Sequence, residues 1–382
     1  MSSGSKVKVL VGTRKGGFIF TSDKDRKKWA ASDILFKGWN LMHMTMDPRD
    51  GRLHAAVDHF VFGATTQHSD DLGQTWTQAT AVPAISRPSK SGRPSSTVEE
   101  AFSGGPPPDK QEEVIKVWNI TPGRADEPGV LYAGVQPATL FKSTDRGETW
   151  ALNESLYDHP QRGEWNPGGG GLCLHTIVLD PSDKNRMYVA ISAAGVYRTD
   201  DGGQTWLPRN KNVLADYSPD KYPEFGQCVH KLDMHPSRPE VLFQQNHCGV
   251  FRSDNCGDDW IDIGEGRLPS RFGFPMAVHP HDPNTIYIAL EDSDQFRMSV
   301  DGQMAVWRSR DAGGSWEHLT KGLPPARVVV LREAMAMDNL EQPGIYAGTD
   351  TGQLFYSRDE GDNWELLADF LPPIQSVETA VV

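Results

Sequence analysis

Two Cys-x-His motifs have the residue types and spacing best suited to chemistry in this chain. In each motif the cysteine and the histidine are two positions apart in a segment that reads as a β-strand. Because successive side chains of a strand point to opposite faces, both are expected on the same face. Imidazoles that converge on one point are typical ligands of Zn, Mn or Fe, with a carboxylate as an added ligand or base. The motifs are Cys173/His175 and Cys228/His230, and the predicted metal ligands are His43, His175, His230 and His247.

The same histidines have two other interpretations. Without a metal they form a general acid/base group, with Arg14 and Arg332 holding an anionic substrate. Alternatively His175 and His230 bond to the backbone of a neighbouring sheet, and the cysteines are small buried apolar residues. The sequence leaves all three interpretations open.

Further site residues are expected beside these motifs. Glu333 is the first candidate for a catalytic carboxylate and Glu378 the second, and Arg14 and Arg332 complete the predicted catalytic set. Aromatic and basic side chains near the same positions are predicted to bind the substrate. These are Trp118, Trp165, Arg271 and Lys15.

A repeated eight-residue segment predicts the elements that position these residues. Ser/Thr-x-Asp-x-Gly-x-Thr-Trp occurs at 69–76, 143–150 and 199–206, with looser copies at 253–260, 309–316 and 357–364 and a decayed copy at 21–29. Its Asp and Ser/Thr side chains suit hydrogen bonds to local backbone, its Gly suits a positive φ, and its Trp suits packing under the turn. Each copy is therefore interpreted as a hairpin turn, with no catalytic role for its Asp.

The strands between these turns predict an all-β, seven-bladed β-propeller in one domain, 1–382. Each repeat contains four short antiparallel strands with the turn before the fourth. Residues 376–382 form a strand left over at the end, which is expected to join the first blade and close the ring. The active face should then lie opposite the repeated turns, near the central axis.

Long connections interrupt this pattern at about 77–115, 151–172 and 207–227. Loops of this length in a compact domain are usually functional or disordered. The first two are interpreted as a lid over the axial pocket, with Trp165 as a surface on which a sugar or ring stacks.

The repeats resemble the BNR/Asp-box superfamily. The number of repeats and the segment Gly12-Thr13-Arg14-Lys15-Gly16-Gly17 resemble those of bacterial "BNR-repeat glycosyl hydrolase" or "exo-α-sialidase-like" proteins. The resemblance implies a hydrolase- or lyase-type, glycosidase-like enzyme acting on a small polar, anionic or carbohydrate-like substrate. The Phe/Tyr-Arg-Ile-Pro motif of true sialidases is absent, so sialidase activity is not expected. The alternative is a non-catalytic binding or assembly propeller, as among photosystem II assembly factors and sortilin-type receptors.

Composition sets the remaining limits. The formal net charge is −13, which argues against a nucleic-acid partner. No apolar run reaches the length needed to span a bilayer, and the N-terminus has no signal-peptide core, so a cytoplasmic protein is expected. Four cysteines do not make a disulfide framework.

Overall fold

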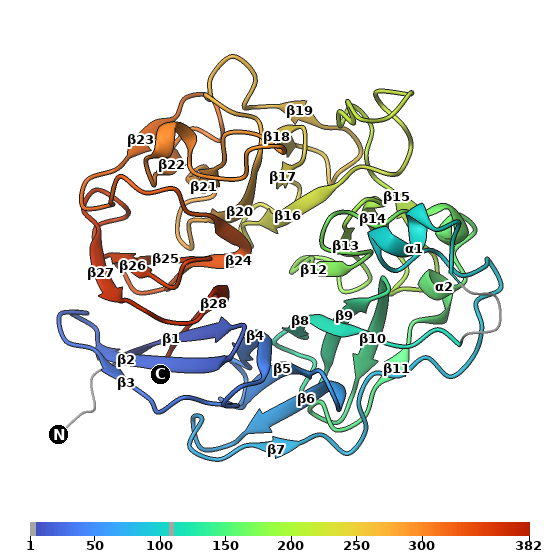
Figure 1. Cartoon of the computed structure of the whole chain (residues 1–382), viewed down its shortest axis with the longest axis horizontal. Helices are drawn as coiled ribbons and strands as arrows, with labels where there is room; N and C mark the ends of the chain where they lie inside the picture. Colours follow the sequence, from blue (N-terminus) through green and yellow to red (C-terminus); the bar gives the residue numbers. More distant parts are fainter. Residues whose placement is uncertain (1–4, 107–110) are drawn as a thin grey trace.

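The computed structural model of the chain describes residues 5–106 and 111–382. Residues 107–110 of the predicted insertion 77–115 and the first four residues of the chain lie outside them. The all-β prediction is confirmed: antiparallel sheets are arranged around a central axis, as in a propeller (Figure 1).

Five sheets within the described residues have four strands each, with the strands in sequence order from the axis outward. They comprise β4 (Asn40–Met46), β5 (Leu53–His59), β6 (Gly63–Ser69) and β7 (Thr77–Gln78); β8 (Lys116–Pro122), β9 (Leu131–Gln136), β10 (Thr139–Ser143) and β11 (Ala151–Leu152); β12 (Leu174–Leu179), β13 (Met187–Ile191), β14 (Gly195–Thr199) and β15 (Leu207–Pro208); β16 (Val229–Met234), β17 (Leu242–Asn246), β18 (Gly249–Ser253) and β19 (Ile261–Asp262); and β20 (Gly273–Val278), β21 (Ile286–Leu290), β22 (Val306–Ser309) and β23 (Glu317–Leu319).

An eight-stranded sheet joins the two ends of the chain, in the order β27-β26-β25-β24-β28-β1-β2-β3. Its strands are β1 (Lys6–Thr13), β2 (Gly16–Asp23), β3 (Ala30–Ala31), β24 (Val330–Met337), β25 (Ile345–Thr349), β26 (Leu354–Ser357), β27 (Glu365–Ala368) and β28 (Ile374–Val381). The C-terminal strand β28 pairs antiparallel with β1, from Val7↔Val381 to Thr13↔Ile374. A single parallel bridge, Glu333↔Ser376, connects β28 to β24.

The repeated segment forms a tight turn between the third and fourth strands of a sheet. Ser69 Oγ accepts a hydrogen bond from Gly73 N at 2.9 Å, and the Asp71 carboxylate accepts from Thr75 N at 2.8 Å. Gly73 has a φ of 93°, which an L side chain rarely adopts. Hydrogen bonds from Thr75 and Ser69 lower the pKa of Asp71 to about 2. The carboxylate is therefore an acceptor that holds the turn.

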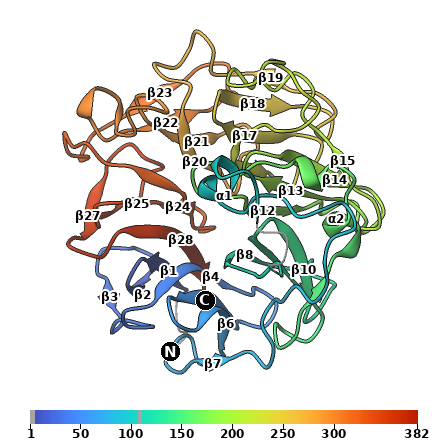
Figure 2. The same ribbon diagram turned by 45° about the vertical axis from the view of Figure 1, so that its right-hand side comes forward.

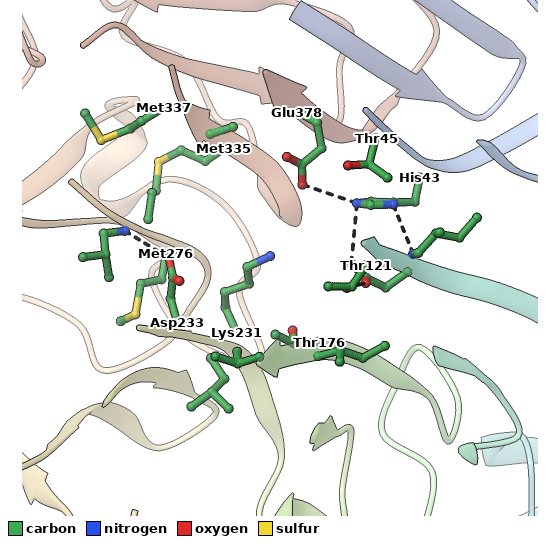
Figure 3. Close-up of a pocket in the computed structure, with 18 of the residues that line it drawn as sticks. His43, Thr45, Thr121, Thr176, Lys231, Asp233, Met276, Met335, Met337 and Glu378 are labelled. Atoms are coloured by element: carbon green, nitrogen blue, oxygen red, sulfur yellow. Dashed lines mark hydrogen bonds and ion pairs between the residues drawn. The ribbon is translucent and has the colours of Figure 1, made fainter. Parts of the chain in front are cut away.

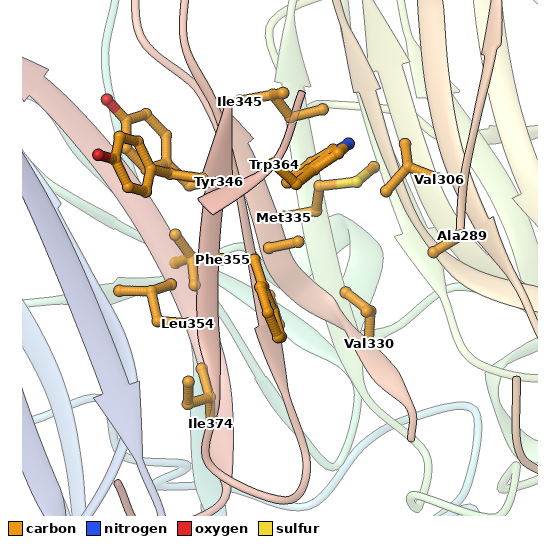
Figure 4. Close-up of a cluster of buried hydrophobic side chains, with 14 of the residues drawn as sticks. Ala289, Val306, Val330, Met335, Ile345, Tyr346, Leu354, Phe355, Trp364 and Ile374 are labelled. Carbon is orange, nitrogen blue, oxygen red and sulfur yellow. The ribbon is translucent and has the colours of Figure 1, made fainter. Parts of the chain in front are cut away.

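Apolar side chains fill the space between neighbouring sheets. The largest cluster joins the β20–β23 sheet to β24–β27 and β28, and includes Trp364, Met335 and Ile374 (Figure 4). Gly348 in β25 lies so close to Ile374 that a Cβ there would meet Ile374 Cγ2 at 2.5 Å. The C-terminal strand is thus packed against the last sheet as well as paired with β1.

The insertions 77–115 and 151–172 contain short helices and are linked to each other by an ion pair. α1 (Val98–Phe102) stands in front of the ring of sheets, as Figure 2 shows, and α2 (Glu154–Tyr157) and a 3-10 turn at Arg162–Glu164 follow later in the chain. Arg162 and Glu112 form a fully buried ion pair at 2.7 Å between the two insertions.

A second 3-10 turn is Val300–Gly302. In the described ranges, no helix has the length and hydropathy that a membrane crossing requires.

Candidate functional site

A cavity of about 590 Å³ lies where the innermost strands begin. Because each sheet is antiparallel, this end is opposite the turn that joins the third and fourth strands. Arg14, Lys116, Trp118 and Arg332 line it, together with the backbone of Gly169–Gly170. The structure therefore brings the predicted Arg14, Trp118 and Arg332 to one pocket.

Four cations surround this pocket without carboxylate partners. Among the residues that the structure describes, no carboxylate oxygen lies within 4.0 Å of the side-chain nitrogens of Arg14, Lys116, Arg297 or Arg332. Lys116 and Arg332 instead lie over the Trp118 ring, 5.9 and 5.5 Å from its centroid, in cation–π geometry. Uncompensated positive charge in a concave site attracts anions, and here it occurs on a protein with a net charge of −13.

A sulfur and two imidazoles meet beside this pocket. Cys228 Sγ is 3.6 Å from His230 Nε2, and the ligand atoms of Cys228, His230 and His247 all lie within 4.8 Å of one another. His230 Nδ1 is 2.6 Å from the carbonyl oxygen of Gly273 and donates to it, so Nε2 is the ring nitrogen that faces the sulfur. Asp294 Oδ2 lies 3.4 Å from His247 Nε2.

The same side chains line a neighbouring cavity of about 330 Å³ that shares Arg297, Arg332 and Phe274 with the first. Burial raises the pKa of the Cys228 thiol, but the hydrogen bonds and charges of the two imidazoles outweigh it and hold that pKa well below its ordinary value. Burial lowers the pKa of His247, while Cys228 and Asp294 raise it above its ordinary value overall. These directions favour a thiolate at Cys228 and a cationic His247, whereas burial lowers the pKa of His230.

A second group of polar residues lies farther along the axis, in a channel of about 320 Å³ (Figure 3). Glu378 Oε1 is 3.3 Å from His43 Nε2, and Lys231 forms an ion pair with Glu333. Burial raises the pKa of Glu378, but His43 and Lys231 lower it below its ordinary value overall. Glu333 lines the basic pocket and Lys231 lines the second space, so their ion pair connects the two.

The structure does not bring the four predicted metal ligands together. His43 lies in the axial channel, and His175 is fully buried with both ring nitrogens engaged, Nδ1 to Thr176 Oγ1 at 2.8 Å and Nε2 to Val229 O at 3.0 Å. A register shift near the start of β4, β8, β12 and β16 explains the place of His43, because it leaves Met42, Trp118, His175 and His230 between paired neighbours. By this register, His230 corresponds to Met42, and His43 lies one residue beyond.

Three predicted substrate-binding residues lie away from the pocket. Trp165 is buried and donates a hydrogen bond from Nε1 to Tyr197 Oη at 2.9 Å, so it is a core residue and offers no stacking surface. Arg271 is paired with Asp262 at 2.5 Å. Lys15 is exposed and lines neither cavity.

Comparisons with known proteins place the fold among β-propellers. A xyloglucanase of Acetivibrio thermocellus is 25% identical over 164 residues, which cover 39% of this chain and 18% of that protein. The chain therefore spans less than a fifth of that relative's length. A GH74 enzyme of Niastella koreensis (TM-score 0.53, 15% identity, 98% of this chain and 66% of that one) and a structure described as YCF48 bound to D1 peptide (TM-score 0.52, 13% identity, 95% and 88%) share its fold. No protein-family model matches the chain.

The fold is a propeller shared with enzymes and other proteins. Three residues that line the cavities were not predicted from the sequence: Lys116, Arg297 and Asp294. Asp294 and Arg297 lie in the connection between β21 and β22, where no motif marks them. The one available signal was their position in the loop after the second strand of a sheet. His247 occupies the equivalent loop of the preceding sheet.

Proposed function

We propose that the chain is a glycosidase-like hydrolase acting on a small, anionic, carbohydrate-like substrate in the basic pocket. The observation that carries the proposal is the set of four cations without carboxylate partners around a cavity of about 590 Å³. That volume falls within the range of small-ligand sites, roughly 300–1,000 Å³. The sequence similarity to a xyloglucanase supports the glycosidase-like class.

The roles of individual residues follow from their contacts. Arg14 and Arg332 would hold the negative charge of the substrate, and Arg297 and Lys116 would add to the positive field. Glu333 is the carboxyl group at the floor of the pocket, 5% exposed, with Oε1 lacking a hydrogen-bond partner in the described structure. Glycoside hydrolysis needs a proton donor and a base or nucleophile, and Glu333 is our candidate for one of them.

Binding and turnover of defined oligosaccharides test this proposal. Uronate- or sulfate-bearing oligosaccharides should raise the thermal midpoint and release reducing ends, whereas matched neutral xyloglucan oligosaccharides should bind more weakly. Arg332→Met should weaken anionic binding by roughly tenfold to a hundredfold, because a hydrogen bond to a charged group contributes about 1.5–3 kcal/mol. Arg238→Met is the control, since Arg238 follows the far end of β16.

Two outcomes contradict the proposal in different ways. Equal binding of neutral and anionic sugars, unaffected by Arg332→Met, would refute the anionic substrate. Anion binding that depends on Arg332 without any turnover would refute the hydrolase and favour a non-catalytic binding propeller.

We also propose that the ring has seven blades and that β28 closes it. Support comes from the pairing of β28 with β1 and from the single bridge that joins β28 to β24. Cutting the eight-stranded sheet at that bridge leaves two groups of four strands, β24–β27 and β28 with β1–β3. Pairing with β28 covers the edge of β1 that would otherwise be exposed, which is the physical advantage of this arrangement.

A further inference from the structure

We propose that Cys228, His230 and His247 bind one divalent transition metal ion, with zinc as the preferred ion. This inference concerns the protein's metal content and does not depend on the proposed hydrolase activity. The three residues come from two elements of one sheet, β16 with the residue preceding it and the connection that follows β17. Cys228 and His230 are buried, and the His247 side chain is 20% exposed.

The distances suit a tetrahedral ion. Zinc bound to sulfur at about 2.3 Å and to nitrogen at about 2.0–2.1 Å separates those two ligand atoms by about 3.6 Å at the tetrahedral angle. Cys228 Sγ and His230 Nε2 are 3.6 Å apart. Thiolate and imidazole together are ligands that suit zinc, and three protein ligands are typical of catalytic zinc sites.

Surrounding groups already orient both imidazoles. The Gly273 carbonyl oxygen accepts from His230 Nδ1 at 2.6 Å, which turns Nε2 toward Cys228 Sγ. The His230 ring stacks on Phe274 at 4.4 Å, which limits its rotation. Asp294 stands 3.4 Å from His247. Carbonyl and carboxylate partners of this kind accompany metal-bound histidines and tune their affinity.

The other Cys-x-His motif supplies an internal comparison. His175 uses Nδ1 and Nε2 for hydrogen bonds to Thr176 and Val229, so neither nitrogen is free to bind an ion. Cys173 contacts Arg332 Nη1 at 3.8 Å and belongs to no group of three potential metal ligands among the described residues. Sequence-equivalent motifs in adjacent sheets thus differ in the one property that metal binding requires.

Two other arrangements are less well supported by the contacts. Cys228 as a nucleophile would need one base, whereas two imidazoles converge on its sulfur. The group His43, Glu333 and Glu378 has its ligand atoms within 4.8 Å of one another, but Lys231 already pairs with Glu333. A metal at Cys228 would border the 330 Å³ cavity and supply a Lewis acid to it.

Metal analysis of the full chain tests the inference. Protein dialysed against Zn²⁺ and then against buffer should retain about one ion per chain, and Co²⁺ in its place should give a thiolate-to-cobalt absorption band. Cys228→Ser and His247→Ala should lose the ion and the band, while the matched variant Cys173→Ser keeps both. Asp294→Asn should weaken Zn²⁺ affinity by about 10- to 100-fold.

Urea unfolding of each variant separates loss of the site from loss of the fold. His247 is partly exposed, so His247→Ala decides the matter if Cys228→Ser does not fold. The inference is overturned if the wild-type protein binds neither Zn²⁺ nor Co²⁺, or if Cys173→Ser and Cys228→Ser reduce the bound metal equally. Retention of the full stoichiometry in His247→Ala would also overturn it, by showing that the ion binds elsewhere.

Discussion

Glu291, which follows β21, is a buried carboxyl group whose replacement should stabilise the protein at neutral pH. It is 2% exposed, and neither carboxylate oxygen has a hydrogen-bond partner within the described residues. Desolvation raises its pKa from 4.5 to about 8, against the opposing charge of Arg297. The unfolded chain therefore ionises Glu291 near pH 4.5, while the folded protein keeps it neutral up to about pH 8.

The sign of the pH dependence follows directly. For a folded pKa above the unfolded value, the group's contribution to stability is fully present below pH 4.5 and is lost as the pH rises through about 8. Each pKa unit corresponds to about 1.4 kcal/mol, so the unfolding free energy lost by pH 7 is about 3 kcal/mol. Glu291→Gln, which cannot ionise, should regain that amount at pH 7 and nothing at pH 4.5.

Urea denaturation of both proteins at pH 4.5, 6, 7 and 8 measures the effect. The variant should have the higher midpoint at pH 7 with an unchanged slope, and the difference should shrink toward zero as the pH falls. Asp292→Asn, an exposed neighbour, is the control and should change little. A constant difference between Glu291→Gln and the wild type across this pH range would refute the reasoning, because titration of Glu291 would then not be its cause.

Four further predictions concern the ring, the insertion 151–172 and the pocket. Ile374→Ala should lower the unfolding free energy by about 2–5 kcal/mol, whereas Leu366→Ala, 51% exposed in β27, should change it by about 0.5 kcal/mol or less. Deleting 374–382 should lower the urea midpoint and broaden the transition, and an unchanged transition would contradict closure by β28. Trp165→Ala should destabilise the fold by about 3–5 kcal/mol. Trp118→Leu should leave the midpoint nearly unchanged and weaken anion binding, as calorimetry with a uronate oligosaccharide would show. Equal binding would remove Trp118 from the site.

Much of the fold was predictable because its signals are local. The turn at 69–76 has its Ser, Asp, Gly and Trp within eight residues, and their hydrogen bonds depend mainly on that segment. The antiparallel order of four short strands then determines which end of the sheets is opposite the turn. Arg14, Trp118 and Arg332 were predicted on that end, and they line the cavity there.

The content of the site was less predictable, because it depends on register and on contacts between distant segments. Alternation along a strand treats His175 and His230 alike, and it treats His43 as their equivalent. The strand pairing shows a register shift that sets His43 apart from the other two, and only the contacts of each ring distinguish His175 from His230. Trp165 likewise is an aromatic residue in a long connection, as a binding residue would be. However, its hydrogen-bond partner Tyr197, against which it is buried, lies 32 residues away in the sequence.

The sequence by itself determined the repeated turns, the all-β class and the end of the sheets where a pocket forms, since each follows from short-range hydrogen bonding and strand alternation. The tertiary structure alone decided which Cys-x-His motif has a ring nitrogen facing its cysteine, which cations lack carboxylate partners, and which tryptophan faces the pocket. The physical reason is that accessibility, lone-pair direction and charge compensation are properties of neighbours in space. In a propeller those neighbours belong to different sheets, as with His230 of β16 and Gly273 of β20.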